Sequence, residues 1–251
     1  MPIRHMASKL LDLEPATGPG AKPDVYHGLA CLALVALAAC SAPAPDESRW
    51  LDDLVLDRQL KDEQFREARD SPVPVERRGM LLPLNYFDPD PAYRVPAALE
   101  VSADQPIYDV PTSTGVLRPM QRVGILKFAL NGEPMQLSAF VEAPVRSIET
   151  LFIPFKDPTN ESETYAAGRY LEPLRTATGL YDLDFNRAFH PYCYYNEGYE
   201  CPYPPPENRL ASTIAAGERL APGFAGFVGP GVVPPPADDE ASAVGTPPTE
   251  P

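Results

Sequence analysis

The sequence predicts a mainly β fold, either an antiparallel sandwich or a small open barrel, with one N-terminal surface helix and a proline-rich loop. Short apolar runs recur between residues 77 and 155 with no helical pattern between them, which favours antiparallel strands. Asn131-Gly132 separates two of these runs, and this dipeptide is the strongest short-range signal of a β-hairpin. The 33 prolines exceed the usual ~5% of residues and gather in stretches that mark turns and linkers.

The surface helix is predicted at residues 48–67. Two apolar pairs spaced four residues apart, Trp50/Leu54 and Leu56/Leu60, give it a narrow apolar face, so we expect it to lie on the domain and not within the core. The prolines that follow the helix end it. The strands that come next are predicted at residues 93–101, 107–110, 123–130, 135–142 and 150–155.

Charged, amide and aromatic side chains are most densely gathered in residues 155–218. Two further strands are predicted in this stretch, at residues 163–171 and 183–187. Strict alternation along the first of them would place Tyr165 and Arg169 on the same face. The density of polar and aromatic side chains indicates that this stretch carries the functional site.

The N-terminal part of the chain contains an apolar run of 12 residues at positions 28–39. A membrane-spanning helix needs ~20 such residues, so the run instead has the length of the central region of a secretory signal peptide. It leads into Leu37-Ala38-Ala39-Cys40, which resembles the lipobox of bacterial lipoproteins. That resemblance implies that Cys40 is lipidated through its sulfur and becomes the first residue of the mature protein. The alternative is a buried alanine-rich helix in which this cysteine is incidental.

These signals divide the chain into four regions. Residues 1–39 are predicted to be a signal peptide, whose unusual length an overextended gene start would explain, and residues 40–47 a lipidated tether. Residues 48–226 are predicted to form a single globular domain, and residues 227–251, rich in proline, alanine and acid, a disordered tail. We therefore expect a protein of the bacterial cell envelope that a lipid anchors to the membrane, facing the periplasm or the exterior.

The net charge of −14 limits the partners of the protein. A strongly acidic chain is unsuited to binding nucleic acid or to electrostatic docking on anionic lipid. Removing residues 1–39 leaves the net charge unchanged, because three basic and three acidic residues lie there. The expected partners are the membrane, through the lipid anchor, and a small molecule or a protein. No cofactor is expected.

Cys193 and Cys201 are predicted to form a disulfide, because an exported chain meets an oxidising compartment. Three alternatives use the same residues. In the first, both cysteines are free and have only a packing role. His190, Cys193 and Cys201 together could bind zinc, although their spacing differs from that of the common zinc fingers, and no metal site is expected. Cys193 could act as a nucleophile with His190 as its base, although residues three apart across a proline rarely point toward each other.

Seven residues of the 155–218 stretch are candidates for ligand binding. In that interpretation Arg169 holds an anionic group of a small polar ligand by a bidentate contact, while tyrosines stack on the ligand. In the structural alternative, Arg169 is a buried ion-pair partner of Asp184 or Glu163, and the asparagines satisfy backbone groups of loops. The seven candidates are Asp157, Glu163, Tyr165, Arg169, Asp184, Asn186 and Asn208.

No catalytic motif can be identified in the sequence, and the catalytic residues are unknown. Two carboxylates among Asp157, Glu163, Asp184 and Glu207 could differ in pKa and act as an acid and a base, as in a hydrolase, but their spacing selects no pair. We therefore expect a binding protein of the cell envelope more than an enzyme. The third interpretation is a structural or assembly lipoprotein without a ligand.

A set of short motifs runs along the second half of the chain. The motifs consist of Asp157, Thr159, Glu163 to Tyr165, Gly168 to Leu171, Leu183 to Ala188, Pro191, Cys193, Cys201-Pro202, Pro204-Pro205, Glu207 to Leu210 and Ala216 to Glu218. Together they resemble the bacterial domain-of-unknown-function family 1684. The resemblance covers about residues 50–220 and implies no activity, since none is attached to that family. The family usually has an asparagine where this chain has His190, so a role for this histidine is not inherited from it.

Overall fold

The structure of the chain is a computed structural model, and it describes residues 47–143, 147–160 and 162–227. All of these residues belong to one compact unit of the chain. The predicted signal peptide, the tether except Glu47, and the tail except Phe227 lie outside the described residues. Cys40 and its expected lipid are therefore outside the described residues as well.

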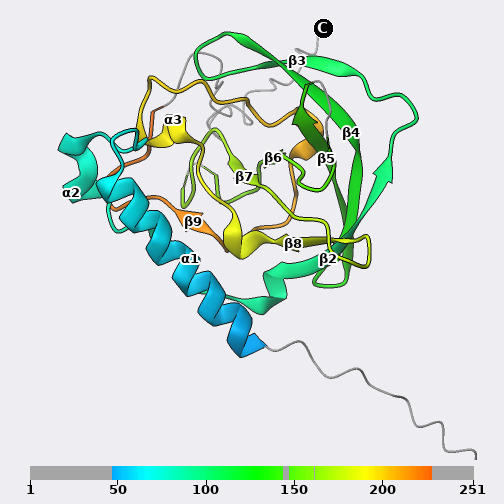
Figure 1. The fold of residues 1–251 in the computed structure, drawn as a ribbon, viewed down its shortest axis with the longest axis horizontal. Helices are drawn as coiled ribbons and strands as arrows, with labels where there is room; N and C mark the ends of the chain where they lie inside the picture. The colour runs from blue at the N-terminus through cyan, green and yellow to red at the C-terminus, as the bar shows by residue number, and fades with distance from the viewer. Residues whose placement is uncertain (1–46, 144–146, 161, 228–251) are drawn as a thin grey trace, which may run out of the picture. The chain divides into compact units, whose positions relative to one another are not determined.

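The predicted surface helix is confirmed as α1 (Glu47–Glu67). Trp50 and Leu54 are buried against the domain, whereas Leu56 and Leu60 are about half exposed. The helix therefore uses one of its two apolar pairs for packing, and it runs along the side of the strands (Figure 1). None of the described helices is long and apolar enough to span a membrane.

The largest sheet in the described part of the chain is antiparallel and has five strands. Its central strand is β4 (Leu117–Leu130), which pairs with β5 (Glu133–Glu142) along one edge. The other edge of β4 pairs first with β3 (Ile107–Pro111) and then with β2 (Arg94–Val101). The N-terminal half of β2 continues the sheet by pairing with β8 (Tyr181–Asp184). The sheet is open, and the mainly β, antiparallel, sandwich-like fold agrees with the prediction.

The predicted hairpin joins β4 and β5. Leu130 pairs with Glu133, so only Asn131 and Gly132 form the loop, at φ values of 52° and 82°. Two consecutive residues at positive φ are what the tight turns of twisted hairpins require. A β-bulge interrupts the same ladder next to Gly124, whose absent side chain lets the backbone of Glu100 approach.

Two small sheets complete the β structure of the described residues. β1 (Asn85–Tyr86) pairs with β9 (Glu218–Arg219), and β6 (Ile153–Phe155) pairs with β7 (Arg169–Leu171). Short helical turns connect these strands: η1 (Val75–Arg77), α2 (Arg78–Leu81), η2 (Pro91–Tyr93), η3 (Phe185–Arg187), α3 (Tyr192–Tyr195) and η4 (Pro206–Asn208).

The buried side chains form two main clusters. The first is aliphatic and lies between the large sheet and β6, with Phe155 and Phe185 in edge-to-face contact within it. The second is aromatic and joins Phe65 of α1 to Tyr165 and to the tyrosines of α3. β7 contributes to both clusters, so the chain from 165 to 171 runs between them.

Two of the predicted strands in the 155–218 stretch are shorter than expected. In the first, only Arg169–Leu171 is extended, and these three side chains are all buried instead of alternating. The reason is that β7 pairs with β6 on one edge and bridges to Phe189 on the other, and packing covers both of its faces. In the second, the strand ends at Asp184 and continues as a 3-10 turn, because the Asp184 carboxylate accepts the backbone N–H of Asn186.

Candidate functional site

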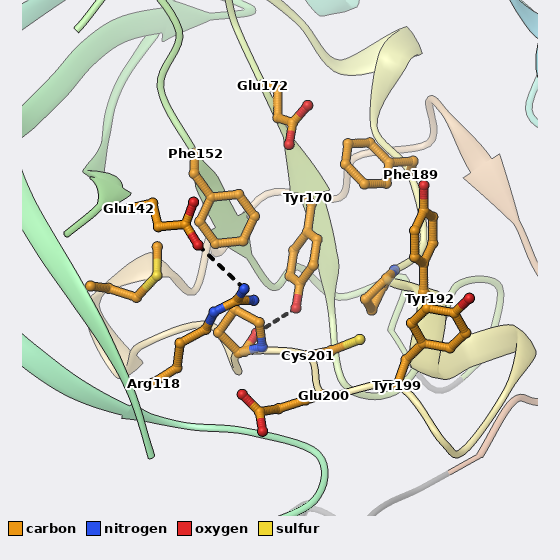
Figure 2. A pocket seen from close by; sticks show the side chains of 13 residues that line it. Arg118, Glu142, Phe152, Tyr170, Glu172, Phe189, Tyr192, Tyr199, Glu200 and Cys201 are labelled. Carbon is orange, nitrogen blue, oxygen red and sulfur yellow. Dashed lines mark hydrogen bonds and ion pairs between the residues drawn. The ribbon is translucent and has the colours of Figure 1, made fainter. Parts of the chain in front are cut away.

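A cleft of about 400 Å³ lies where the loop around α3 meets the ends of β4, β5 and β7. We call it the aromatic cleft, because five of its lining side chains are aromatic (Figure 2). Most of its residues lie between positions 170 and 202, within the stretch that the sequence indicated. The lining residues are Arg118, Met120, Glu142, Phe152, Tyr170, Glu172, Phe189, Pro191, Tyr192, Tyr199, Glu200, Cys201 and Pro202.

The aromatic rings of the cleft form two groups. In the first, the Tyr170 ring meets Phe152 and Phe189 edge to face, with centroids 4.7 and 5.8 Å away. In the second, Tyr192 and Tyr199 meet at 5.3 Å. The Tyr170 hydroxyl donates to the backbone carbonyl of Pro202, which ties β7 to the loop after α3. Edge-to-face contacts between aromatic rings are favourable, so these rings hold one another in place and form an apolar wall of the cleft.

The polar side chains of the cleft are mainly acidic. Arg118 lies 3.5 Å from Glu142, and both side chains are solvent-accessible. Glu172 follows β7 directly, and Glu200 precedes Cys201 in the loop after α3. Figure 2 shows Glu172 and Glu200 at opposite ends of the view with Tyr170 between them. The lining therefore carries three carboxylates and one guanidinium.

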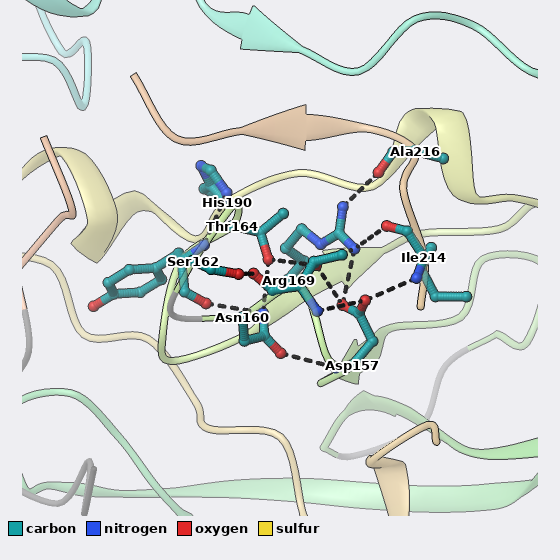
Figure 3. A network of polar contacts seen from close by, with 10 residues as sticks. Asp157, Asn160, Ser162, Thr164, Arg169, His190, Ile214 and Ala216 are labelled. Carbon is teal, nitrogen blue, oxygen red and sulfur yellow. Dashed lines mark hydrogen bonds and ion pairs between the residues drawn. The ribbon is translucent and has the colours of Figure 1, made fainter. Parts of the chain in front are cut away.

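The sequence-predicted ligand-binding residues lie elsewhere, mostly in the interior. Arg169 is fully buried, and its Nη2 contacts Asp157 Oδ1 at 2.9 Å and donates to the carbonyl of Ile214 at 2.8 Å. Its Nη1 donates to the carbonyl of Ala216 (Figure 3). Burial lowers the pKa of Arg169, and the Asp157 carboxylate opposes that shift. The guanidinium thus joins β7 to the segment before β9 and has no contact with a cleft.

Asp157 organises the loop that leads from β6 to β7. Its Oδ1 accepts the Thr159 hydroxyl at 3.0 Å, and its Oδ2 accepts the backbone N–H of Ile214 at 2.8 Å. Asn160 completes the loop, because its side chain accepts the N–H of Asp157 and donates to the Thr164 hydroxyl. The prediction that Arg169 pairs with Asp184 or Glu163 was wrong, because this loop brings the Asp157 carboxylate to the guanidinium instead.

Hydrogen bonds from Asp184 and Asn186 connect α1 and the segment before β2 to the end of β8. The indole N–H of Trp50 donates to Asp184 at 2.8 Å, and Asn186 exchanges two hydrogen bonds with the backbone of Asp90. Asn208 does the same for the backbone of Ser138. These contacts match the structural alternative, in which asparagines satisfy backbone groups.

Tyr165 and Glu163 differ in their surroundings. Tyr165 is fully buried, and its backbone N–H donates to His190 at 3.3 Å. Glu163 is 41% exposed and pairs with Arg219 at 3.0 Å. The seven predicted residues therefore line no common cavity. Six of them are buried in separate networks, and only Glu163 is accessible to a ligand.

A second buried network is centred on Glu218, and the sequence did not indicate it. Its carboxylate accepts Lys61 of α1 at 2.5 Å, the Tyr195 hydroxyl at 2.7 Å and the backbone N–H of His190 at 2.7 Å. Burial raises the pKa of Glu218, but Lys61, His190 and Tyr195 together lower it below its usual value. Lys61 looked like one of many charges on an exposed helix, so nothing in its spacing revealed this contact.

His190 is buried beside this network in its neutral form. Burial lowers its pKa to about 3, with Arg169 and Lys61 acting in the same direction and Glu218 against it. Its ring lies 4.3 Å from the Tyr194 ring, centroid to centroid. In the described part of the chain, no three His, Cys, Asp or Glu side chains are arranged to hold a metal ion.

Cys193 and Cys201 are buried neighbours, and both are free thiols in the structure. The backbone N–H of Cys193 contacts Cys201 Sγ at 3.1 Å, and the hydrogen bond between the thiols lowers the pKa of Cys193 and raises that of Cys201. The predicted disulfide is thus not formed here, although the two residues are adjacent as it requires. It stays a prediction for the protein in an oxidising compartment.

Comparison with known proteins identifies the family. The family model described as "Protein of unknown function (DUF1684)" matches residues 82–219. The chain belongs to this family. Among solved structures, the solution NMR structure of an uncharacterized protein of Haloarcula marismortui is 38% identical and covers 70% of this chain and 96% of its own, with a TM-score of 0.56. A comparison with curated proteins found no match.

Membership of DUF1684 agrees with the resemblance, and the structure shows where the family motifs lie. Tyr170, Pro191, Cys201 and Pro202 line the aromatic cleft, whereas Arg169 is in the interior. Sequence reasoning missed the other side of the cleft, which β4, β5 and the residue before β6 supply. Those residues looked like ordinary strand positions, and only the pairing of distant strands brings them to the cleft.

Replacing Arg169 by Met tests the interior role of the first network. The change leaves the Asp157 carboxylate buried without its counter-ion, so the free energy of unfolding should fall by about 3–5 kcal/mol. Arg94→Met is the matched control, because its pair with Asp182 is solvent-accessible and should contribute less than about 1 kcal/mol. Denaturant unfolding of both variants checks this. Equal small losses would contradict the role of Arg169.

The neutral state of His190 predicts an acid-dependent stability. An unfolded histidine binds a proton near pH 6.5, but the folded protein binds it only near pH 3, so protons favour unfolding between these values. His190→Asn removes that titration. The stability advantage of the wild type over the variant should therefore shrink between pH 7 and 5, as measured by urea unfolding. An advantage that stays constant over this range would show that His190 is not buried as a neutral base.

Proposed function

We propose that this DUF1684 protein is a cell-envelope lipoprotein that binds a small molecule in the aromatic cleft. The observation that carries the proposal is the cleft itself: about 400 Å³ of space beside five aromatic rings, with a few charged groups at its margins. Binding sites for small molecules are concave, mostly apolar and largely pre-formed, with few polar groups that fix orientation. The cleft has each of these properties.

The alternative function, a hydrolase-like enzyme, would need two of the four candidate carboxylates to face one substrate, and these four are not arranged in that way. Asp157 and Asp184 are buried in separate networks, where their oxygens already accept hydrogen bonds. Glu163 and Glu207 contact arginines at the surface instead. A general acid and base must both reach one substrate, and these four carboxylates do not converge. The proposal is accordingly a binding protein.

The envelope location is part of the proposal and rests on the sequence. The apolar run at residues 28–39 and the lipobox-like residues ending in Cys40 support export and lipidation. The compact unit begins soon after Cys40, so a short tether would hold this unit close to a membrane surface.

A fragment screen by NMR on the isotope-labelled full chain tests the binding site. Hits should shift the signals of residues around Tyr170 and Tyr192. Tyr192→Ala should weaken their binding about three- to tenfold, because it removes one stacking face. Tyr108→Ala is the matched control, since Tyr108 is also 41% exposed but lies outside the cleft. Hits that map elsewhere, or that bind the Tyr192 variant equally well, would refute the proposed site.

Mass spectrometry of the protein extracted from bacterial membranes tests its location. The N-terminal peptide should begin at Cys40 and carry the mass of attached acyl chains. Without reduction, a peptide linking Cys193 and Cys201 is expected, because the thiols are adjacent and the compartment is oxidising. An unmodified Cys40 in an intact precursor would contradict the lipoprotein assignment, and Cys40→Ala should release the protein from the membrane.

A further inference from the structure

We infer that the aromatic cleft selects an organic cation, a molecule with a protonated amine or a quaternary ammonium attached to an apolar or aromatic body. The inference rests on the proposed function and adds the charge class of the ligand. It follows from the charges of the lining, from the environment of Glu172 and from the rings beside it.

The charges of the cleft are unbalanced. Arg118 lies 3.5 Å from Glu142, so these two groups compensate each other. Within the described residues, Glu172 and Glu200 have no ion-pair partner. The cleft therefore presents two uncompensated carboxylates to whatever enters it, and a positive charge is the group that they attract.

Glu172 lies exposed at the edge of the cleft. Burial raises its pKa, and the positive charge of Lys61 opposes that shift. Lys61 does not pair with Glu172, because its ammonium is bound to Glu218 at 2.5 Å. A cation in the cleft would supply the direct partner that Glu172 lacks.

The aromatic rings of the cleft also favour a positively charged ligand. The Lys61 ammonium already lies 4.9 Å from the centroid of the Phe189 ring, so one ring of the cleft makes a cation–π contact within the protein itself. Tyr192 and Tyr199 provide further rings in the same lining. Burial, and to a smaller extent Tyr199 and Glu172, raise the pKa of Tyr192, so its phenol stays neutral at physiological pH. Aromatic faces are the usual means of recognising quaternary ammonium groups, and the carboxylates of the same lining add charge attraction.

An anionic ligand has much less to bind. Arg118 is the only cation among the cleft residues, and it would have to leave Glu142 to pair with the ligand. The anion would also meet the repulsion of Glu172 and Glu200. The anionic ligand expected from the sequence depended on Arg169, which is fully buried and has its partners within the protein.

Three molecules that share a phenylethyl body and differ in the charge of the head group test the preference: 2-phenylethylamine, 2-phenylethanol and 3-phenylpropanoate. Titration into the labelled full chain at pH 7 should show the protonated amine binding about tenfold more tightly than the alcohol, with the carboxylate weakest. Raising the salt concentration should weaken binding of the amine and leave binding of the alcohol unchanged. Binding of 3-phenylpropanoate as tight as that of the amine would overturn the inference while leaving the proposed function intact.

Single substitutions locate the charge that is responsible. Glu172→Gln should weaken binding of the amine about threefold to fivefold without changing binding of the alcohol. Glu197→Gln is the matched control, because it removes the same charge from an exposed residue of the neighbouring loop that does not line the cleft. An unchanged amine affinity in the Glu172 variant would overturn the inference. Absence of any cleft ligand in the fragment screen would remove the proposed function and the inference together.

Discussion

The ion pair between Arg169 and Asp157 is the contact on which the described fold depends most. A buried guanidinium and a buried carboxylate each cost much hydration, and the pair is tolerated because hydrogen bonds satisfy most of both groups. Through this pair, β7 is held to the loop after β6 and to the segment before β9. The loop leads directly into β7, whereas Ile214 of the segment before β9 lies 45 residues beyond Arg169 in sequence. The directional hydrogen bonds of the buried pair therefore fix a distant segment against β7.

Local sequence signals predicted the elements whose geometry is decided locally. The α1 helix, the strands near residues 93–142 and the Asn131-Gly132 hairpin depend on periodicity and on one turn that needs positive φ. The strands between residues 163 and 187 were harder to predict. The side chains of Asp157, Asn160 and Asp184 form hydrogen bonds with nearby backbone groups, and these bonds shorten the strands. Such capping competes with strand pairing, and its outcome depends on tertiary contacts.

The aromatic cleft lies largely within the stretch that the sequence singled out, but the seven candidate residues do not line it. A dense group of polar side chains suggested a pocket, but Arg169, Asn186 and Asn208 use their polar atoms to satisfy the interior. The cleft formed instead where aromatic residues of the same stretch meet Arg118, Glu142 and Phe152 from distant strands. The spacing of residues in the sequence does not reveal this contact, because the contact depends on which strand edges lie side by side in the fold.

Tyr170 stands next to Arg169 in β7, and its ring lines the cleft while its hydroxyl is held by the carbonyl of Pro202. One short strand thus carries both the central contact of the interior and the wall of the cleft. The wall is held by contacts within the protein, so a ligand bound there as proposed would order few further side chains. Tyr192 and Glu200 are exposed at its rim, so substitutions there would alter the lining of the cleft and leave the buried contacts of Arg169 in place.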